Sequence, residues 1–282
     1  MVRARGTSAF AAIVVACAAG ILVLGCGGGG ENKEGGGAGG AKSTDAMPPS
    51  AAAPAPSEAP AAQPAGAASI TGRVMLEGKA PPRRPITMSA DPGCKHPAGG
   101  ETLSDDVLVG PDGAMQNVWV RVVSGLGDRT FPPPAQPVTL DQSGCTFTPH
   151  AVVAQTGQTI EFRNGDTVAH NVHALPKANP GFNMTLPPGG KPTERRFTKP
   201  EAVRVKCDIH PWMGSWVLVN DAPFQSLTGA DGRFTLSGLP AGTYEVEAWH
   251  ERAGVSKQSI TLADGENKSL DFTFAPGRKS GG

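Results

Sequence analysis

The chain lacks several features that mark common protein classes. Aromatic residues make up only 5% of its 282 residues, Lys and Arg balance Asp and Glu at 25 each, and no long hydrophobic run follows residue 25. The zero net charge gives no support to nucleic-acid binding. No Ser-His-Asp spacing or glycine-rich phosphate loop stands out. No helical period appears either, and short runs of alternating apolar residues predict an all-β chain.

The N-terminus has the pattern of an export signal. Residues 1–25 combine two arginines with an apolar stretch, which is typical of a signal peptide and not of a spanning helix. The Gly-Cys pair that ends at Cys26 resembles the lipobox of bacterial lipoproteins, with Cys17 as a rival site. The resemblance implies lipidation at Cys26 and an exported protein, anchored on the periplasmic side, the outer membrane or the cell surface of a bacterium.

The next segment, residues 26–68, is composed of Gly, Ala, Pro, Ser and a few charged residues. It contains almost no large apolar side chains, so it cannot bury enough surface to offset the entropy of the chain. We therefore expect a disordered tether between the anchor and the folded part, which suits a protein that meets its partners by diffusion.

The most informative stretch is residues 203–219, VRVKCDIHPWMGSWVLV. Its first residues alternate apolar and charged, so Cys207 should end a strand with its thiol facing the interior. A proline and a glycine then bend the chain back, which allows His210 and Met213 to converge on the sulfur. A thiolate, an imidazole and a thioether together form part of a copper ligand set.

A mononuclear blue-copper site needs a second histidine, and the upstream run 161–175, EFRNGDTVAHNVHAL, supplies one. Zinc is an alternative, but methionine is a poor zinc ligand. A dinuclear copper site would need a second cysteine in the loop, and the sequence has none there. His170 and His173 should face opposite sides of a strand, so His173 is interpreted as structural.

The motif CDIHPWM resembles the C-x-x-H-x-x-M ligand loop of amicyanin and pseudoazurin within the cupredoxins. The segment AHNVHA resembles the part of that family that carries the first histidine, and the likeness spans about residues 137–220. It implies a single copper, with Asn171 beside the first ligand helping to fix the site. The ligands that it implies are His170, Cys207, His210 and Met213.

The resemblance implies a carrier of single electrons. Four ligands leave no position for a substrate, so we do not expect an enzyme. We expect His210 to present an imidazole edge at the surface beside Pro211 and Trp212, where a redox partner such as a c-type cytochrome or a dehydrogenase would dock. Two alternatives remain open: a copper-delivery lipoprotein without redox cycling, and a cell-surface binding module stabilised by metal.

The sequence after the copper loop indicates a second module. Residues 228–250 resemble the carboxypeptidase regulatory-like (transthyretin-like) β-sandwich repeat, and their turns predict a hairpin. The module is too short to be complete, so its missing strands should lie upstream. We therefore predict a cupredoxin Greek-key β-sandwich at 137–220 and a transthyretin-like sandwich at 221–277, with 69–136 as the first half of the latter or as extra strands on the former.

Two further cysteines and several histidines need an interpretation. Export to an oxidising compartment makes a Cys94–Cys145 disulfide the default expectation. A second metal site formed by these cysteines with His96 and His150 is the competing interpretation. His250, at the end of a predicted strand with no companion ligands, is interpreted as a packing or surface residue.

Overall fold

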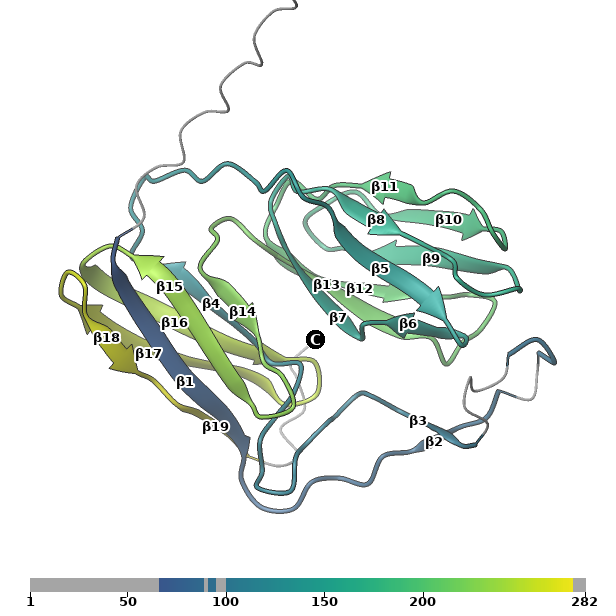
Figure 1. Cartoon of the computed structure of the whole chain (residues 1–282), viewed down its shortest axis with the longest axis horizontal. Helices are drawn as coiled ribbons and strands as arrows, with labels where there is room; N and C mark the ends of the chain where they lie inside the picture. The colour runs from purple at the N-terminus through teal and green to yellow at the C-terminus, as the bar shows by residue number, and fades with distance from the viewer. Residues whose placement is uncertain (1–65, 89–90, 95–99, 276–282) are drawn as a thin grey trace, which may run out of the picture. The chain divides into compact units, whose positions relative to one another are not determined.

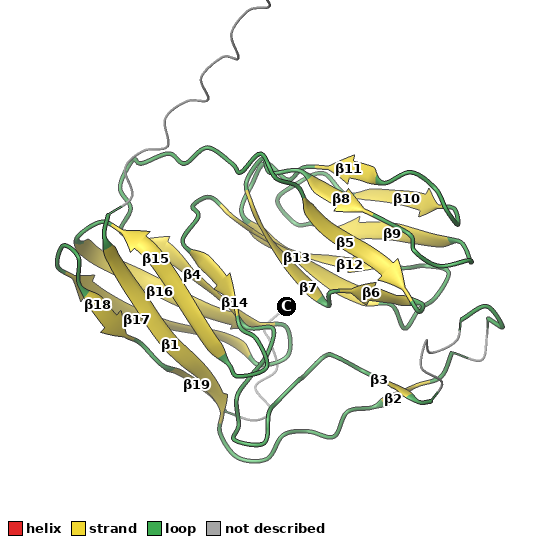
Figure 2. Cartoon of the chain, viewed as in Figure 1, coloured by secondary structure: helices red, strands yellow, loops and turns green. Residues whose placement is uncertain are grey.

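The computed structural model describes residues 66–88, 91–94 and 100–275. Within these residues all regular structure is β-strand, so the all-β prediction is confirmed (Figure 2). The predicted signal peptide, the lipidation site Cys26 and the tether up to residue 65 lie outside the described residues. Among the described residues, no helix is long and apolar enough to cross a membrane.

The strands β5 to β13 form a sandwich of two sheets, which we call the inserted sandwich (Figure 1). One sheet has the order β10-β9-β12-β13-β7 and the other the order β11-β8-β5-β6. Both contain a parallel pair, β13 with β7 and β5 with β8. The strands are β5 (Val138–Ser143), β6 (Thr146–Thr148), β7 (Ala151–Gln155), β8 (Ile160–Phe162), β9 (His170–Leu175), β10 (Phe182–Leu186), β11 (Thr193–Arg195), β12 (Glu201–Lys206) and β13 (Gly214–Asn220).

Alternation along these strands explains why they pack as a sandwich. In β12, Val203 and Val205 are buried while Arg204 points to solvent. The inward residues of both sheets, among them Phe162 and Val217, meet in one core that also contains Phe197, Cys207 and Met213. The predicted copper residues are therefore part of the packed interior.

The chain on either side of β5 to β13 forms a second sandwich, which we call the split sandwich. Its sheets have the orders β15-β1-β18, with β19 also paired to β1, and β14-β4-β16-β17. The upstream strands β1 and β4 thus pair with the downstream strands. The elements are β1 (Ala68–Leu76), β4 (Trp119–Ser124), β14 (Gln225–Leu227), β15 (Arg233–Leu239), β16 (Gly242–His250), β17 (Gly254–Leu262), β18 (Asn267–Ser269) and β19 (Phe272–Phe274).

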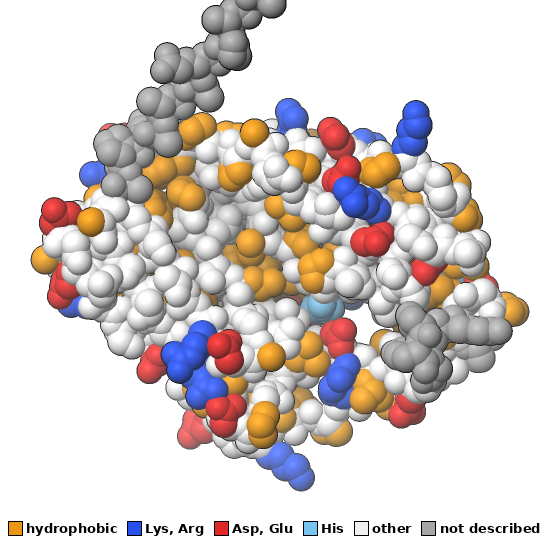
Figure 3. Space-filling view, viewed as in Figure 1, with side chains coloured by type: hydrophobic (Ala, Val, Ile, Leu, Met, Phe, Trp, Pro, Cys, Tyr) orange, Lys and Arg blue, Asp and Glu red, His pale blue; other side chains and the backbone are white. Residues whose placement is uncertain are grey.

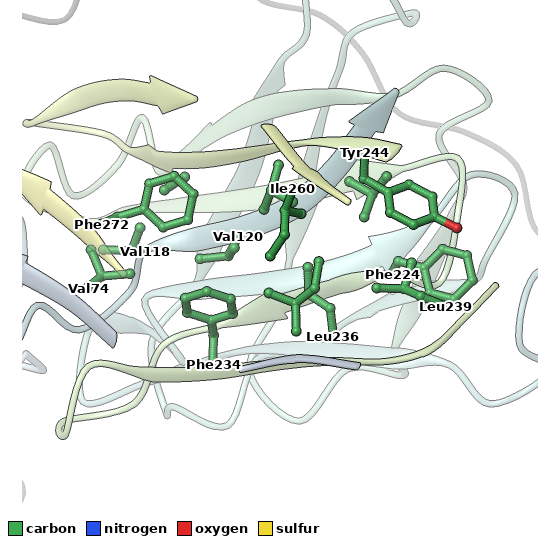
Figure 4. Close-up of a cluster of buried hydrophobic side chains, with 14 of the residues drawn as sticks. Val74, Val118, Val120, Phe224, Phe234, Leu236, Leu239, Tyr244, Ile260 and Phe272 are labelled. Atoms are coloured by element: carbon green, nitrogen blue, oxygen red, sulfur yellow. The ribbon is translucent and has the colours of Figure 1, made fainter. Parts of the chain in front are cut away.

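The core of the split sandwich is apolar (Figure 4). Aliphatic side chains from β1 and β4 and aromatic ones from β15 and β19 share this core, and the ring centroids of Phe234 and Phe272 lie 6.1 Å apart. Each inward side chain is buried because β-strands direct alternate residues to one face. This core needs strands from both ends of the chain.

The hairpin predicted within residues 228–250 is wrong. β15 pairs with β1, while β16 pairs with β4 and β17, so the two strands lie in different sheets. The chain crosses between the sheets at Pro240, whose carbonyl accepts a hydrogen bond of 2.6 Å from the Tyr244 hydroxyl. This arrangement is a tyrosine corner, a device that fixes such crossings in β-sandwiches.

The segment between β1 and β4 belongs to both sandwiches. Its short strands β2 (Pro85–Ile86) and β3 (Thr102–Leu103) pair with each other. The turn 91–94 within this segment is joined to the inserted sandwich by a disulfide between Cys94 and Cys145. The chain before β5 therefore supplies β1 and β4 to the split sandwich and the disulfide-bonded turn 91–94 to the inserted sandwich.

Charged side chains of both signs lie interspersed on the face shown in Figure 3. Ion pairs join several charged residues of the described chain, for example Arg121 with Glu247 at 2.8 Å and Arg83 with Asp105 at 2.5 Å. Such mixing of signs fits the zero net charge and gives this face no extended basic surface.

Candidate metal centre

Cys207 directly follows β12 and points into the core of the inserted sandwich, as the alternation of that strand predicts. The loop after it is closed by its own backbone. The Cys207 N–H donates to the Met213 carbonyl at 3.2 Å, and the Met213 N–H donates to the His210 carbonyl at 2.9 Å. His210 and Met213 are both buried, so the tight loop returns both side chains to the interior beside the thiol.

His170 begins β9, the strand that pairs with β12. Its Nδ1 lies 2.8 Å from Nδ1 of His210, and Nδ1 of His210 lies 3.9 Å from the Cys207 Sγ. One ligand atom from each of these three residues lies within 4.8 Å of the others, and all three side chains are buried. The structure therefore brings the three strongest predicted donors to one point, with Met213 buried in the same core.

Each imidazole also contacts a carboxylate through its other nitrogen. Nε2 of His170 lies 2.9 Å from Oδ2 of Asp166, and Nε2 of His210 lies 3.0 Å from Oδ2 of Asp91. An ionised carboxylate only accepts hydrogen bonds, so both Nε2 atoms donate. Carboxylates that hold the outer nitrogen of a histidine in this way orient the ring and raise its basicity as a metal ligand.

This arrangement leaves the two inner nitrogens facing each other. With a proton on each Nε2, a neutral imidazole has a lone pair on Nδ1. At 2.8 Å the two Nδ1 atoms either share a proton in a hydrogen bond or turn both lone pairs toward one cation, and the Cys207 sulfur lies 3.9 Å from Nδ1 of His210. A donor set of two imidazole nitrogens, a thiolate and a thioether suits a copper ion.

The environment of Cys207 favours the thiolate that a metal needs. Burial raises its pKa, but hydrogen bonding with His170 and with the backbone N–H groups of Asn171, His210 and Ile209 outweighs burial, and the pKa falls from 9 to about 7. For His170, burial lowers the pKa, while its contacts with Cys207 and Asp166 raise it more, so the net shift is upward. The two side chains thus stabilise each other's charged form.

Asn171 holds the two ligand segments together. Its backbone N–H donates to the Cys207 Sγ at 3.5 Å, and its side-chain Oδ1 accepts the Asp208 N–H at 2.6 Å. The Asp208 carboxylate in turn contacts Lys206 at 2.8 Å and His173 at 2.9 Å, which lowers its pKa. His173 therefore lies outside the ligand group and serves this outer network.

The expected exposed edge of His210 is wrong. The His210 side chain is only 2% exposed, because the turn 91–94 covers it with Asp91. Trp212 is half-buried, with its ring centroid 5.1 Å from that of His210 and its Nε1–H donating to the Cys145 carbonyl at 3.0 Å. Pro211 is exposed, as is Ile209 at 48%.

The remaining cysteines and histidines have other partners. Cys94 and Cys145 form a disulfide, whereas His150 lies against Glu251 of the split sandwich. The proposed second metal site is therefore not assembled by these three residues, and His96 lies outside the described residues. His250 is buried, and its Nδ1 accepts N–H groups of Arg252 and Ala253 at 3.1 and 3.3 Å.

Reasoning from the sequence missed Asp91 and Asp166. Asp91 lies 119 residues from its histidine partner, in an Asp-Pro-Gly-Cys turn that gives no local sign of a role. Asp166 lies four residues before His170. This spacing indicates a contact only when the loop that carries Asp166 bends back onto the strand.

The chain is similar in part to several solved structures. A Cu-containing nitrite reductase (NirK) from Thermus scotoductus SA-01 is 26% identical with a TM-score of 0.29, covering 36% of this chain, and the chain spans 26% of that enzyme. A purple cupredoxin from Nitrosopumilus maritimus is 21% identical with a TM-score of 0.26, covering 29% of this chain and 99% of that chain. Amicyanin from Paracoccus versutus is 23% identical with a TM-score of 0.26, covering 36% and 97%.

Comparison with curated proteins found no match. A family model does match the C-terminal part of the chain. The match begins within β13 of the inserted sandwich and ends after β19, so it includes neither β1 nor β4. Residues 215–275 match the carboxypeptidase regulatory-like domain.

Proposed function

We propose that the protein is an exported copper protein that carries single electrons between redox partners. The observation that supports this most strongly is the convergence of His170 Nδ1, His210 Nδ1 and Cys207 Sγ at one buried point. Met213, buried on the same loop, supplies the weak fourth ligand. Copper in such a set accepts and releases one electron.

The surroundings of the donors suit electron exchange and not chemistry on a substrate. His170, Cys207 and His210 are each at most 2% exposed, so water has little access to them. Two imidazoles, a thiolate and a thioether also leave no position for a substrate. The protein is therefore proposed to be a carrier and not an enzyme.

Electrons would leave through the side of the ligand loop. The Trp212 ring packs on His210, and Ile209 and Pro211 are exposed on the same loop. An apolar surface of this kind suits a brief encounter with another redox protein, such as a c-type cytochrome or a dehydrogenase. Ile209 extends the docking surface that the sequence assigned to Pro211 and Trp212.

The proposed location rests on the sequence alone. The export signal and lipidation at Cys26 would place the carrier outside the cytoplasmic membrane, on the tether predicted over residues 26–68 and a membrane anchor. Mass spectrometry of the protein isolated from its membrane tests this proposal. An unmodified Cys26 in the mature protein would argue against the anchor.

Copper loading of the full chain tests the ligand set. After addition of one equivalent of Cu(II), we expect a strong thiolate-to-copper band in the visible spectrum. His173→Gln is a matched control, because His173 lies beside the ligand group without belonging to it. Absence of the band in the unaltered chain, or its loss in His173→Gln with retention in His170→Gln, would contradict the assignment.

A further inference from the structure

The turn that carries Cys94 also carries the carboxylate that holds His210. Asp91 Oδ1 accepts the Gly93 N–H at 2.8 Å, the Asp91 carbonyl accepts the Cys94 N–H at 3.0 Å, and Oδ2 contacts His210 Nε2. The four-residue turn is therefore a unit that presents a sulfur to Cys145 and a carboxylate to the imidazole.

The turn that carries Cys145 is built in the same way around the other imidazole. Gly144 and Cys145 join β5 to β6 with φ of 63° and 54°, a left-handed conformation that a cysteine rarely adopts. Asp166 accepts both of their N–H groups, at 2.7 and 2.8 Å, and contacts Nε2 of His170. One carboxylate thus fixes both the unusual turn and the ligand ring.

The disulfide lies directly against the ligands. Both of its sulfurs fall in one group with a ring nitrogen of His210, and Cys145 falls in another with Asp166 and His170, each group within 4.8 Å. Both half-cystines are buried. Each half-cystine therefore connects through one short turn to one carboxylate and through that carboxylate to one imidazole.

We infer that the Cys94–Cys145 disulfide, with Asp91 and Asp166, is a positioning clamp for His210 and His170, and that opening the disulfide loosens the hold on the metal. The inference rests on the proposed metal site. Opening takes two electrons and two protons from a dithiol reductant, which becomes a disulfide while Cys94 and Cys145 become thiols. Asp91 then remains on His210 only through hydrogen bonding from an exposed turn.

The two halves of the clamp differ in what holds them without the disulfide. Asp166 lies within the inserted sandwich, where its carboxylate accepts the N–H groups of Gly144 and Cys145 and its own N–H donates to Oδ1 of Asn164 at 3.0 Å. Asp91 comes from the segment before the sandwich and is 31% exposed. Reduction should therefore release His210 and leave His170 in place.

The first experiment observes the metal-free full chain by NMR of histidine ring nitrogens labelled with ¹⁵N. With the disulfide intact, both His170 and His210 should carry the proton on Nε2. Reduction with dithiothreitol, or the double change Cys94→Ser with Cys145→Ser, should turn His210 into a mixture of tautomers while His170 keeps its pattern. An unchanged His210 pattern after verified reduction would overturn the clamp.

The second experiment measures transfer of Cu(I) from the loaded full chain to bicinchoninate under anaerobic conditions. Since loss of a partner of a metal-binding histidine typically costs about 10- to 100-fold in affinity, we expect transfer to accelerate by about that factor in the double serine variant and in Asp91→Ala. Asp91→Asn, whose amide oxygen still accepts a hydrogen bond, should restore most of the retention.

Asp105→Asn is the matched control, because Asp105 is a carboxylate of the same segment that pairs with Arg83 away from the ligands. Its transfer rate should equal that of the unaltered chain. Equal rates in all variants, in a chain that shows the copper band, would overturn the clamp and leave the proposed function standing. If the unaltered chain shows no copper band, the proposed function is wrong. The NMR measurement on the metal-free chain would still test the clamp.

Discussion

The two sandwiches differ in what some of their buried polar side chains contact. In the split sandwich they serve the backbone: the Thr228 hydroxyl donates to the Met115 carbonyl at 2.7 Å and accepts the Val118 N–H at 2.9 Å, and His250 accepts two N–H groups. In the inserted sandwich, two imidazoles and a thiol face one another instead. The first set contacts backbone groups, whereas the second forms a donor set that suits a cation.

This difference separates scaffold from site. The apolar core of the split sandwich is complete in itself (Figure 4). The core of the inserted sandwich exchanges part of its apolar packing for donor atoms at the end where β12 leads into the ligand loop. Burying polar groups away from water is costly, so the three donors gathered at this end support the proposed metal site.

The largest expected effect comes from a change at the metal ligands of the inserted sandwich. Cys207→Ser should abolish the visible copper band completely, because a hydroxyl does not replace the soft thiolate. Thr228→Ala, a buried polar change in the split sandwich, is the matched control and should keep the band. A band that persists in Cys207→Ser would remove this residue from the site.

A change in the apolar core tests the split sandwich in the same way. Phe234→Ala should lower the free energy of unfolding by about 3–5 kcal/mol, since a buried aromatic ring is replaced by a cavity. Folded molecules should still bind copper with the unaltered spectrum. Phe162→Ala, a comparable loss in the inserted sandwich, should both destabilise the protein and change the spectrum, as urea titration and absorption would record.

We expect His250 to make the stability of the split sandwich depend on pH. Burial lowers its pKa from 6.5 to about 4. Between these values the unfolded chain binds a proton that the folded chain does not, so stability is complete above pH 6.5 and falls as the pH drops toward 4, by about 3 kcal/mol.

Denaturant titrations at several pH values measure this loss. His250→Asn is the matched variant, because its amide oxygen accepts the same N–H groups without titrating. The slope of the free energy of unfolding against pH should differ between the two proteins, and this difference is the contribution of His250. Equal slopes would mean that the burial of His250 does not govern the pH response.

The smallest change concerns the weakest ligand. Met213→Leu should keep the visible band and raise the reduction potential, because it removes a thioether that stabilises Cu(II). Voltammetry of the two copper-loaded chains records the shift. An unchanged potential would show that Met213 packs in the core without acting as a ligand.

How much the sequence predicted depended on how local the signal was. Cys207, His210 and Met213 lie within seven residues, so their spacing alone indicated a ligand loop, and the alternation in β12 placed the thiol inside. The strands themselves were predictable for the same reason. Asp91 was not, because its role depends on a contact across 119 residues with His210.

The error at Pro240 has a similar cause. The short connection between β15 and β16 looks like a hairpin turn, but the partner of β15 is β1, with Ile70 opposite Leu236. Pairing with a strand far upstream decided the topology, and the tyrosine corner made the crossing possible. The residues of the short turn gave no indication that β15 pairs with β1.

In the proposed function, the buried donors of the inserted sandwich hold one copper that exchanges single electrons. Voltammetry of the full chain loaded with one equivalent of copper tests it most directly. We expect one reversible one-electron wave that is absent from the metal-free chain and from Cys207→Ser. Copper that binds at these residues without a reversible wave would contradict electron transfer and leave only a metal-holding role.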